Sequence, residues 1–179
     1  MNHCASILLS FITACSSLAV AGESEFLGDI HQITQAGRRS GEGYYRQNPK
    51  GENRWIIFQS ERDAENPFYQ IYLKDLKNGT TRRVSPGFGK STCAWIHPHQ
   101  DRLLFSMTTY SPSKAQQLQN HKLEERKAKQ KKRYSWDYDP HYDVFETDWK
   151  GGIIRNLTRT HGYDAEASWS SDGSWIVFA

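Results

Sequence analysis

The chain has 179 residues and a small formal net charge of +3, with 23 Lys and Arg set against 20 Asp and Glu. Aromatic residues make up 13% of it, which supplies enough apolar surface for the core of one domain of ordinary size. No segment has enough consecutive apolar residues to cross a bilayer, so the sequence predicts no membrane-spanning helix.

The first residues have the features of an export signal. Residues 5–12 form a short apolar core, and Ala19-Val20-Ala21 offers a small-x-small cleavage site. Ile12-Thr13-Ala14-Cys15 also resembles a bacterial lipobox, in which Cys15 would be acylated. We therefore expect an exported, periplasmic protein whose signal peptide ends at residue 21, or at residue 14 in a lipoprotein anchored through Cys15.

Three stretches of the remaining chain share one hairpin design. Residues 44–58, 93–105 and 165–179 each read as a strand, a turn and an apolar strand that contains a Phe near its end. In the last stretch the turn is Ser171-Asp172-Gly173, and Asp and Gly tolerate the backbone angles of a tight reversal. The chain is therefore a repeat protein.

A second type of hairpin follows the first. Residues 71–85 align with residues 144–158, and both stretches read as strand, turn, strand. The identical pairs are Asp75/Asp148, Lys77/Lys150, Gly79/Gly152 and Arg82/Arg155. Each repeat therefore combines two hairpins into a unit of four antiparallel strands.

The spacing of the repeats places an insertion in the second unit. Phe58 and Phe105 are 47 residues apart, whereas Phe105 and Phe178 are 73 apart, and the extra 26 residues fall within the segment 109–140. Four strands every 40 to 50 residues is the spacing of a β-propeller blade. We therefore predict an all-β fold of about two and a half blades, an incomplete ring, with a helical insertion in the second blade.

The ends of the repeat region point to a longer protein. His31-Gln32-Ile33-Thr34 resembles the last strand of a unit, and propellers commonly close their ring by pairing such an N-terminal strand with the last blade. No last blade precedes Ala179. We therefore interpret residues 22–179 as the N-terminal part of a propeller.

The strands themselves predict a core and little chemistry. Residues 55–58, 103–105 and 175–178 are continuous apolar runs, as expected of strands covered on both faces, and we read their aromatic residues as core. Cys93, a lone thiol in a predicted strand, is read as a small buried apolar residue.

Motifs that suggest a ligand fail on their context. Residues 87–91 end in Gly-Lys-Ser but lack the first Gly and the helix of a phosphate-binding loop. Asp137 and Asp139 lie in a stretch that departs from the calcium-loop pattern, and His97 and His99 fit a turn. We therefore expect no catalytic residue, no cofactor, no metal and no nucleic-acid partner.

The insertion has a distinctive charge. It begins with Ser111-Pro112, a common helix opening, and continues to Arg133 with good helix formers. Between Lys122 and Arg133 there are seven Lys or Arg and two Glu, a local net charge of +5. Such a segment is either a solvated helix surface or a contact for acidic proteins or anionic headgroups.

Blade geometry predicts one contact surface. In an up-and-down blade, the connection between the second and third strands shares a face with the connection to the next blade. The insertion and the loops 86–92 and 159–164 should therefore lie together. Aromatic and basic residues there are candidates for binding a partner: Lys90, Arg133, Tyr134, Trp136 and Tyr163.

The repeats resemble those of the TolB-type β-propeller family, whose hairpin typically reads Trp-Ser-Pro-Asp-Gly-x-x-Ile-x-Phe. Here Trp169-Ser170 precedes residues 171–179, although Ser171 stands where the family has Pro. The resemblance implies a non-enzymatic scaffold of the bacterial cell envelope that binds a protein or peptide. The alternative is the propeller portion of a peptidase whose catalytic domain lies beyond residue 179, because similar blades occur in such proteases.

Overall fold

The computed structural model describes residues 22, 25–46, 53–128 and 138–179. The chain divides into two compact units, residues 1–33 and 34–179, and every strand and helix of the described residues belongs to the second. The predicted signal peptide and Cys15 lie outside the described residues. Residues 31–34 belong to no strand here, so their pairing with a last blade stays a prediction.

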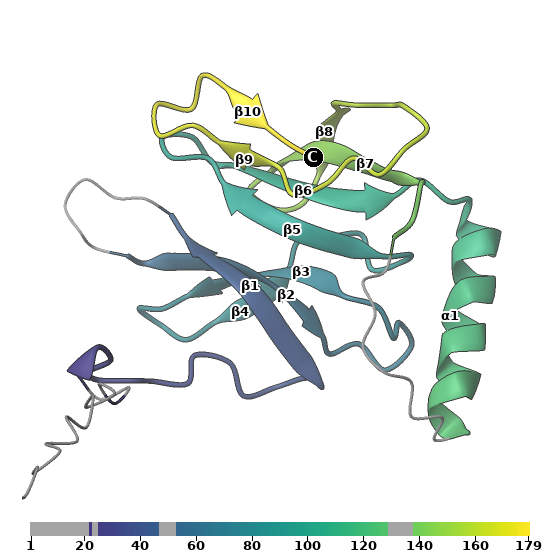
Figure 1. The fold of residues 1–179 in the computed structure, drawn as a ribbon, viewed down its shortest axis with the longest axis horizontal. Coiled ribbons are helices and arrows are strands. Elements are labelled where there is room, and N and C mark those ends of the chain that lie inside the picture. The colour runs from purple at the N-terminus through teal and green to yellow at the C-terminus, as the bar shows by residue number, and fades with distance from the viewer. Residues whose placement is uncertain (1–21, 23–24, 47–52, 129–137) are drawn as a thin grey trace, which may run out of the picture. The chain divides into compact units, whose positions relative to one another are not determined.

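Two antiparallel sheets of four strands make up most of the second unit (Figure 1). The first sheet contains β1 (Arg39–Tyr45), β2 (Trp55–Glu61), β3 (Gln70–Asp75) and β4 (Thr81–Arg83). The second contains β5 (Ser91–Ile96), β6 (Arg102–Thr108), β7 (Tyr142–Asp148) and β8 (Ile153–Asn156), and a further hairpin is formed by β9 (Ser168–Trp169) and β10 (Ile176–Val177). Strands are ordered in each sheet as in the chain, so the all-β prediction and its repeated unit are confirmed, although the described sheets form no closed ring.

The core lies between the sheets. Ile57, Ile71 and Leu73 of the first sheet pack in one cluster with Leu103 and Phe105 of the second. The opposite face of the second sheet packs on the third hairpin, where Leu104 and Val144 lie against Ala167 and Trp169. Because β6 and β7 are covered on both faces, their side chains are almost all buried, as the continuous apolar runs predict.

The third hairpin departs from this prediction. Trp175, Val177 and Phe178 are exposed by 76%, 67% and 50%, so the interpretation of these residues as core is wrong. β10 pairs with β9 alone, and no further sheet of the described residues packs on its outer side. Similar apolar runs are therefore buried or exposed according to what lies next to them.

The helix predicted in the insertion is confirmed as α1 (Pro112–Lys127), between β6 and β7. The Ser111 hydroxyl accepts a hydrogen bond from the Lys114 backbone N–H at 3.4 Å, as an N-terminal cap does. The Gln119 side chain is buried and bridges the loops of both sheets, accepting from Gly89 N and donating to Glu65 O. Within the residues that the structure describes, no helix has both the length and the apolar character of a membrane-spanning segment.

Candidate functional site

The same irregularity lies in or just before the first strand of each repeat. Glu42, Cys93 and Glu166 have left-handed backbones, with φ angles of 46°, 51° and 58°. Residues other than Gly rarely adopt this conformation, which costs about 1–2 kcal/mol at each position. Strained residues of this kind cluster at functional sites.

The pairing of the strands explains why these three positions are equivalent. Gly41 pairs with Gln59 and Thr92 with Ser106, and in each case the register then slips by one residue before Tyr44 and Trp95. In the third repeat the corresponding residue, Ala165, exchanges backbone hydrogen bonds with Ala179 at 2.9 and 3.0 Å. The left-handed residue is thus the first residue of a bulge that each unit repeats.

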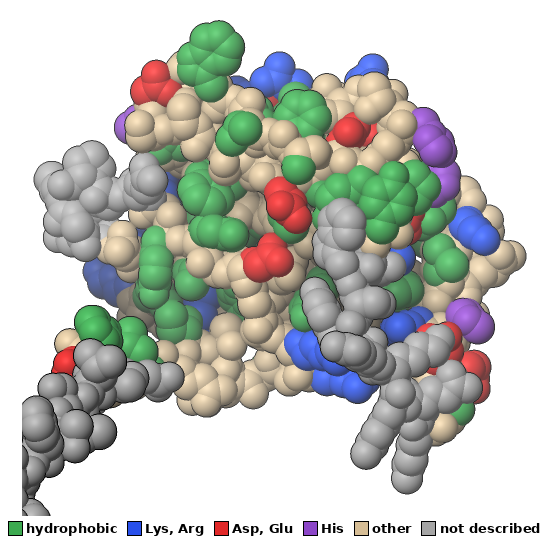
Figure 2. Space-filling view, viewed as in Figure 1, with side chains coloured by type: hydrophobic (Ala, Val, Ile, Leu, Met, Phe, Trp, Pro, Cys, Tyr) green, Lys and Arg blue, Asp and Glu red, His purple; other side chains and the backbone are tan. Residues whose placement is uncertain are grey.

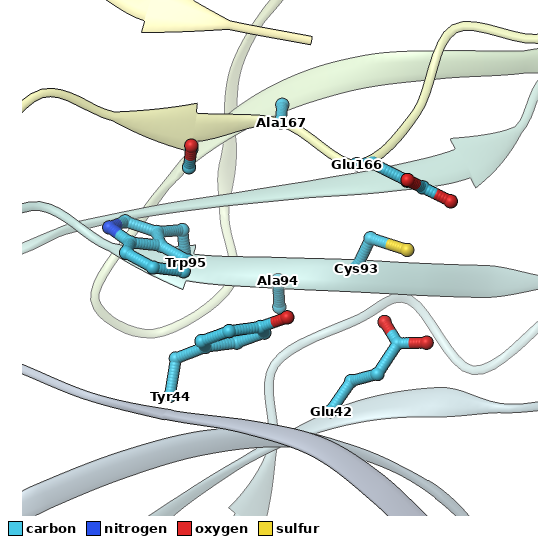
Figure 3. A pocket seen from close by; sticks show the side chains of 8 residues that line it. Glu42, Tyr44, Cys93, Ala94, Trp95, Glu166 and Ala167 are labelled. Atoms are coloured by element: carbon cyan, nitrogen blue, oxygen red, sulfur yellow. The ribbon is translucent and has the colours of Figure 1, made fainter. Parts of the chain in front are cut away.

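The bulges converge on a hollow of about 360 Å³. β5 lies between β1 and β9 in Figure 1, so the three first strands are neighbours. In Figure 3 the carboxylates of Glu42 and Glu166 lie on either side of the Cys93 thiol. The hollow is lined by Glu42, Tyr44, Cys93, Ala94, Trp95, Glu166, Ala167 and Ser168.

Aromatic rings form one wall of the hollow. The rings of Tyr44 and Trp95 are 4.5 Å apart between centroids and inclined by 42°. They occupy equivalent positions, each two residues after a left-handed residue. Figure 2 shows acidic side chains at the centre of this face with hydrophobic side chains around them. The hollow therefore combines an aromatic surface with two carboxylates.

The hollow carries negative charge from its two carboxylates. Burial is the main reason why the pKa of the Cys93 thiol is raised to about 12; the hydrogen bond with Thr92 opposes this shift, and the charges of Glu42 and Glu166 contribute to it. Burial, followed by the charges of Glu42, Cys93 and Glu166, also raises the pKa of Tyr44. Cys93 is therefore a neutral thiol at neutral pH and a poor nucleophile.

A contact between the sheets holds the middle bulge. The Gln59 side-chain oxygen accepts hydrogen bonds from the Thr92 hydroxyl at 2.8 Å and from the Cys93 backbone N–H at 3.3 Å. Gln59 is itself buried in β2 of the preceding sheet. The left-handed conformation of Cys93 is therefore stabilised by the neighbouring repeat.

The connections predicted to share a face do lie together. Gly89 N donates to Gln119 of α1, and Gly162 N donates to Pro140 O at 3.1 Å. Lys90 forms an ion pair with Asp139 at 3.0 Å between side chains that are both largely buried. This face is therefore formed jointly by the insertion and the two loops.

The predicted contact residues have different positions on this face. The ammonium group of Lys90 is engaged by Asp139, and Tyr163 stacks on the exposed Tyr138 with ring centroids 5.7 Å apart. Arg133, Tyr134 and Trp136 lie outside the described residues. A partner surface at these five residues stays a prediction.

The basic segment of the insertion is largely ion-paired where it is described. Lys122 and Lys127 pair with Glu125 and Glu124 within α1, and Arg126 pairs with Glu61 of β2 at 2.7 Å. The rest of the segment lies outside the described residues. Contact with an anionic surface stays a prediction.

The motifs set aside in the sequence have structural roles. Gly89 O accepts from the side chains of Asn66 and Gln70, and the Nδ1 atom of His97 accepts from the backbone of His99 and Gln100, as expected of a turn. Asp139 accepts from Tyr110 as well as pairing with Lys90, whereas Asp137 lies outside the described residues. In the part of the chain that the structure describes, no group of three or more His, Cys, Asp or Glu could hold a metal ion.

Sequence reasoning missed the hollow. The sequence pattern marks Cys93 only as a buried apolar residue, Glu42 precedes the first hairpin, and Glu166 lies in the hairpin 165–179 with no role assigned to it. A signal was available, because Cys93 and Glu166 are 73 residues apart, the same spacing as Phe105 and Phe178. Extending the repeat alignment to the start of each first strand would have placed the three residues at one position.

The comparisons with known proteins are sparse. No protein-family model matches the chain, and no curated protein matches it. A solved structure from Agrobacterium tumefaciens, whose description names TolB, is similar to it with a TM-score of 0.40 and 17% sequence identity. The match covers 71% of this chain and 39% of that one, so this chain spans well under two thirds of that protein. The resemblance to the TolB-type repeat stays a prediction from the sequence.

Proposed function

We propose that the chain is part of an exported β-propeller that binds a peptide or protein segment in the hollow between β1, β5 and β9. In this proposal the two sheets and the third hairpin are successive blades, and their first strands border the central channel. The location in the bacterial cell envelope rests on the export signal and on the resemblance to TolB-type repeats.

The observation that carries the proposal is the bulge repeated at Glu42, Cys93 and Glu166. Strained residues cluster at functional sites, and here three repeats each place one at the same position beside one hollow. The hollow also has the features of a ligand site, because it is concave, partly aromatic and contains a few polar groups.

The proposed role is binding without catalysis. The nucleophile closest to the two carboxylates, the Cys93 thiol, has a pKa of about 12 and is protonated at neutral pH. A peptidase would require its catalytic groups elsewhere. The peptidase alternative already places its catalytic domain beyond residue 179, so the protonated thiol supports binding without catalysis only for the described residues.

Binding can be tested by titrating the ¹⁵N-labelled full chain with a panel of short peptides of acidic, neutral and basic composition, followed by NMR. We expect saturable shifts concentrated at the amides of β1, β5 and β9. Tyr44→Ala should weaken this binding because Tyr44 lines the hollow, whereas Tyr45→Ala is the matched control on the opposite face of β1. Absence of binding by every peptide, or shifts confined to the face around Tyr163, would refute the proposal.

A further inference from the structure

We propose that the hollow recognises the guanidinium group of an arginine side chain in its peptide ligand. This inference rests on the proposed peptide binding and specifies its chemistry. It follows from three features of the hollow: the placement of its carboxylates, its aromatic wall and its size.

The two carboxylates of the hollow favour a cationic ligand. Glu42 and Glu166 approach the hollow from different repeats, and no Lys, Arg or His of the described residues lines it. Within the described part of the chain, neither carboxylate forms an ion pair, in contrast to Glu61 and Glu146, which pair with arginines. Burial is the main cause of the raised pKa values of Tyr44 and Cys93, and the charges of Glu42 and Glu166 contribute to both.

The aromatic wall favours guanidinium over ammonium. A guanidinium is planar and weakly hydrated, so that it stacks on aromatic rings while its edges donate to carboxylates. In Figure 3 the Tyr44 ring lies between Trp95 and the two carboxylates, so the hollow offers an aromatic surface at one end and carboxylates at the other. An ammonium ion is compact and strongly hydrated and gains less from this arrangement.

The chain uses the same combination for one of its own arginines. The Arg54 guanidinium lies 4.9 Å from the centre of the Trp55 ring and pairs with Asp75 at 2.6 Å. One aromatic ring and one carboxylate suffice there. The hollow presents two rings and two carboxylates without an arginine of the described residues.

The size of the hollow limits the ligand. A volume of about 360 Å³ is at the lower end of the range for small-molecule pockets, roughly 300–1,000 Å³. It accommodates one long side chain with its adjoining backbone and excludes a folded domain. Both carboxylates are exposed, so the attraction is screened by salt.

The test uses four peptides, acetylated and amidated at their ends, that differ only in a central residue: arginine, lysine, citrulline or glutamate. Citrulline keeps the shape of arginine and lacks its charge. In NMR titrations of the labelled full chain we expect the arginine peptide to bind at β1, β5 and β9, about fivefold to tenfold more tightly than the citrulline peptide. The lysine peptide should be intermediate, and the glutamate peptide should not bind.

Variants assign the effect to the carboxylates. The double variant Glu42→Gln/Glu166→Gln should bind the arginine peptide about fivefold to tenfold more weakly and should bind the citrulline peptide with unchanged affinity. Glu65→Gln/Glu124→Gln is the matched control, because it changes the net charge equally at two exposed residues outside the hollow. Both proteins should retain the spectrum of the folded chain, since all four residues are exposed.

The outcomes separate this inference from the function on which it rests. Equal binding of the arginine peptide and either the citrulline or the lysine peptide at the hollow would overturn the guanidinium assignment and leave peptide binding intact. If both double variants lost the same affinity for the arginine peptide, the guanidinium assignment would also be overturned, because the effect would then come from the net charge of the protein. Absence of binding by all four peptides, together with the wider panel, would overturn both.

Discussion

The turn between β7 and β8 offers a sharp test of how the two sheets pack. Gly151 has a φ of +93°, and a Cβ atom added there would lie 2.2 Å from Val84 O. Val84 follows β4 of the first sheet and is buried. Gly79, in the equivalent turn of the first sheet, has a φ of +78° but nothing within 4 Å of such an atom. Replacing each Gly by Ala therefore separates backbone strain from contact between sheets.

The magnitudes follow from this geometry. Both variants place an alanine in the left-handed region, which costs about 1–2 kcal/mol. Only Gly151→Ala also overlaps a buried backbone carbonyl, and overpacking of that kind costs about 1–3 kcal/mol more. We expect Gly79→Ala to lower the free energy of unfolding by about 1–2 kcal/mol and Gly151→Ala by about 2–5 kcal/mol.

Urea unfolding of the full chain, followed by tryptophan fluorescence and far-ultraviolet circular dichroism, measures both losses. The slope of the transition should be unchanged, because the same surface is exposed on unfolding. Equal losses in the two variants would refute the packing of this turn on the first sheet, and with it the stacking of successive units.

Two further predictions concern single ionisable groups. Burial alone raises the pKa of Asp139, but hydrogen bonds from Lys90 and Tyr110 outweigh it and lower the pKa below its ordinary value. The native state therefore binds this proton less readily than the unfolded chain does. The original chain should be more stable than Asp139→Asn at neutral pH, and this difference in the free energy of unfolding should decline below about pH 4. A difference that does not change with pH in acid unfolding would contradict this. The Cys93 thiol has a pKa of about 12. At pH 8 a thiol-specific disulfide reagent should therefore react with Cys93 far more slowly in the folded chain than in the chain unfolded by urea. Equal rates would show that the fold does not protect the thiol.

The fold was predicted from the sequence where local signals were sufficient. Apolar runs such as residues 55–58 and 103–105 became buried middle strands, and Ser111 caps the helix expected after it. The repeated Asp148 stabilises its turn by accepting from the backbone N–H groups of Lys150 and Gly152, each at 2.8 Å. These signals lie within a few residues of the structure that they specify.

The third hairpin shows the limit of such reasoning. Its apolar run is as long as that of β2, yet Trp175 and Phe178 are largely exposed. Burial depends on the sheet that packs alongside, and this information is not contained in the run itself.

By itself, the sequence determined the four-strand repeat, the site of the insertion and the helix within it, because strand alternation, turn residues and helix caps act over short distances. Only the tertiary structure decided that Glu42, Cys93 and Glu166 line one hollow. Their left-handed backbones arise from register shifts between paired strands, and their proximity arises from the stacking of three repeats. Both are interactions between residues far apart in the chain, which no local pattern encodes.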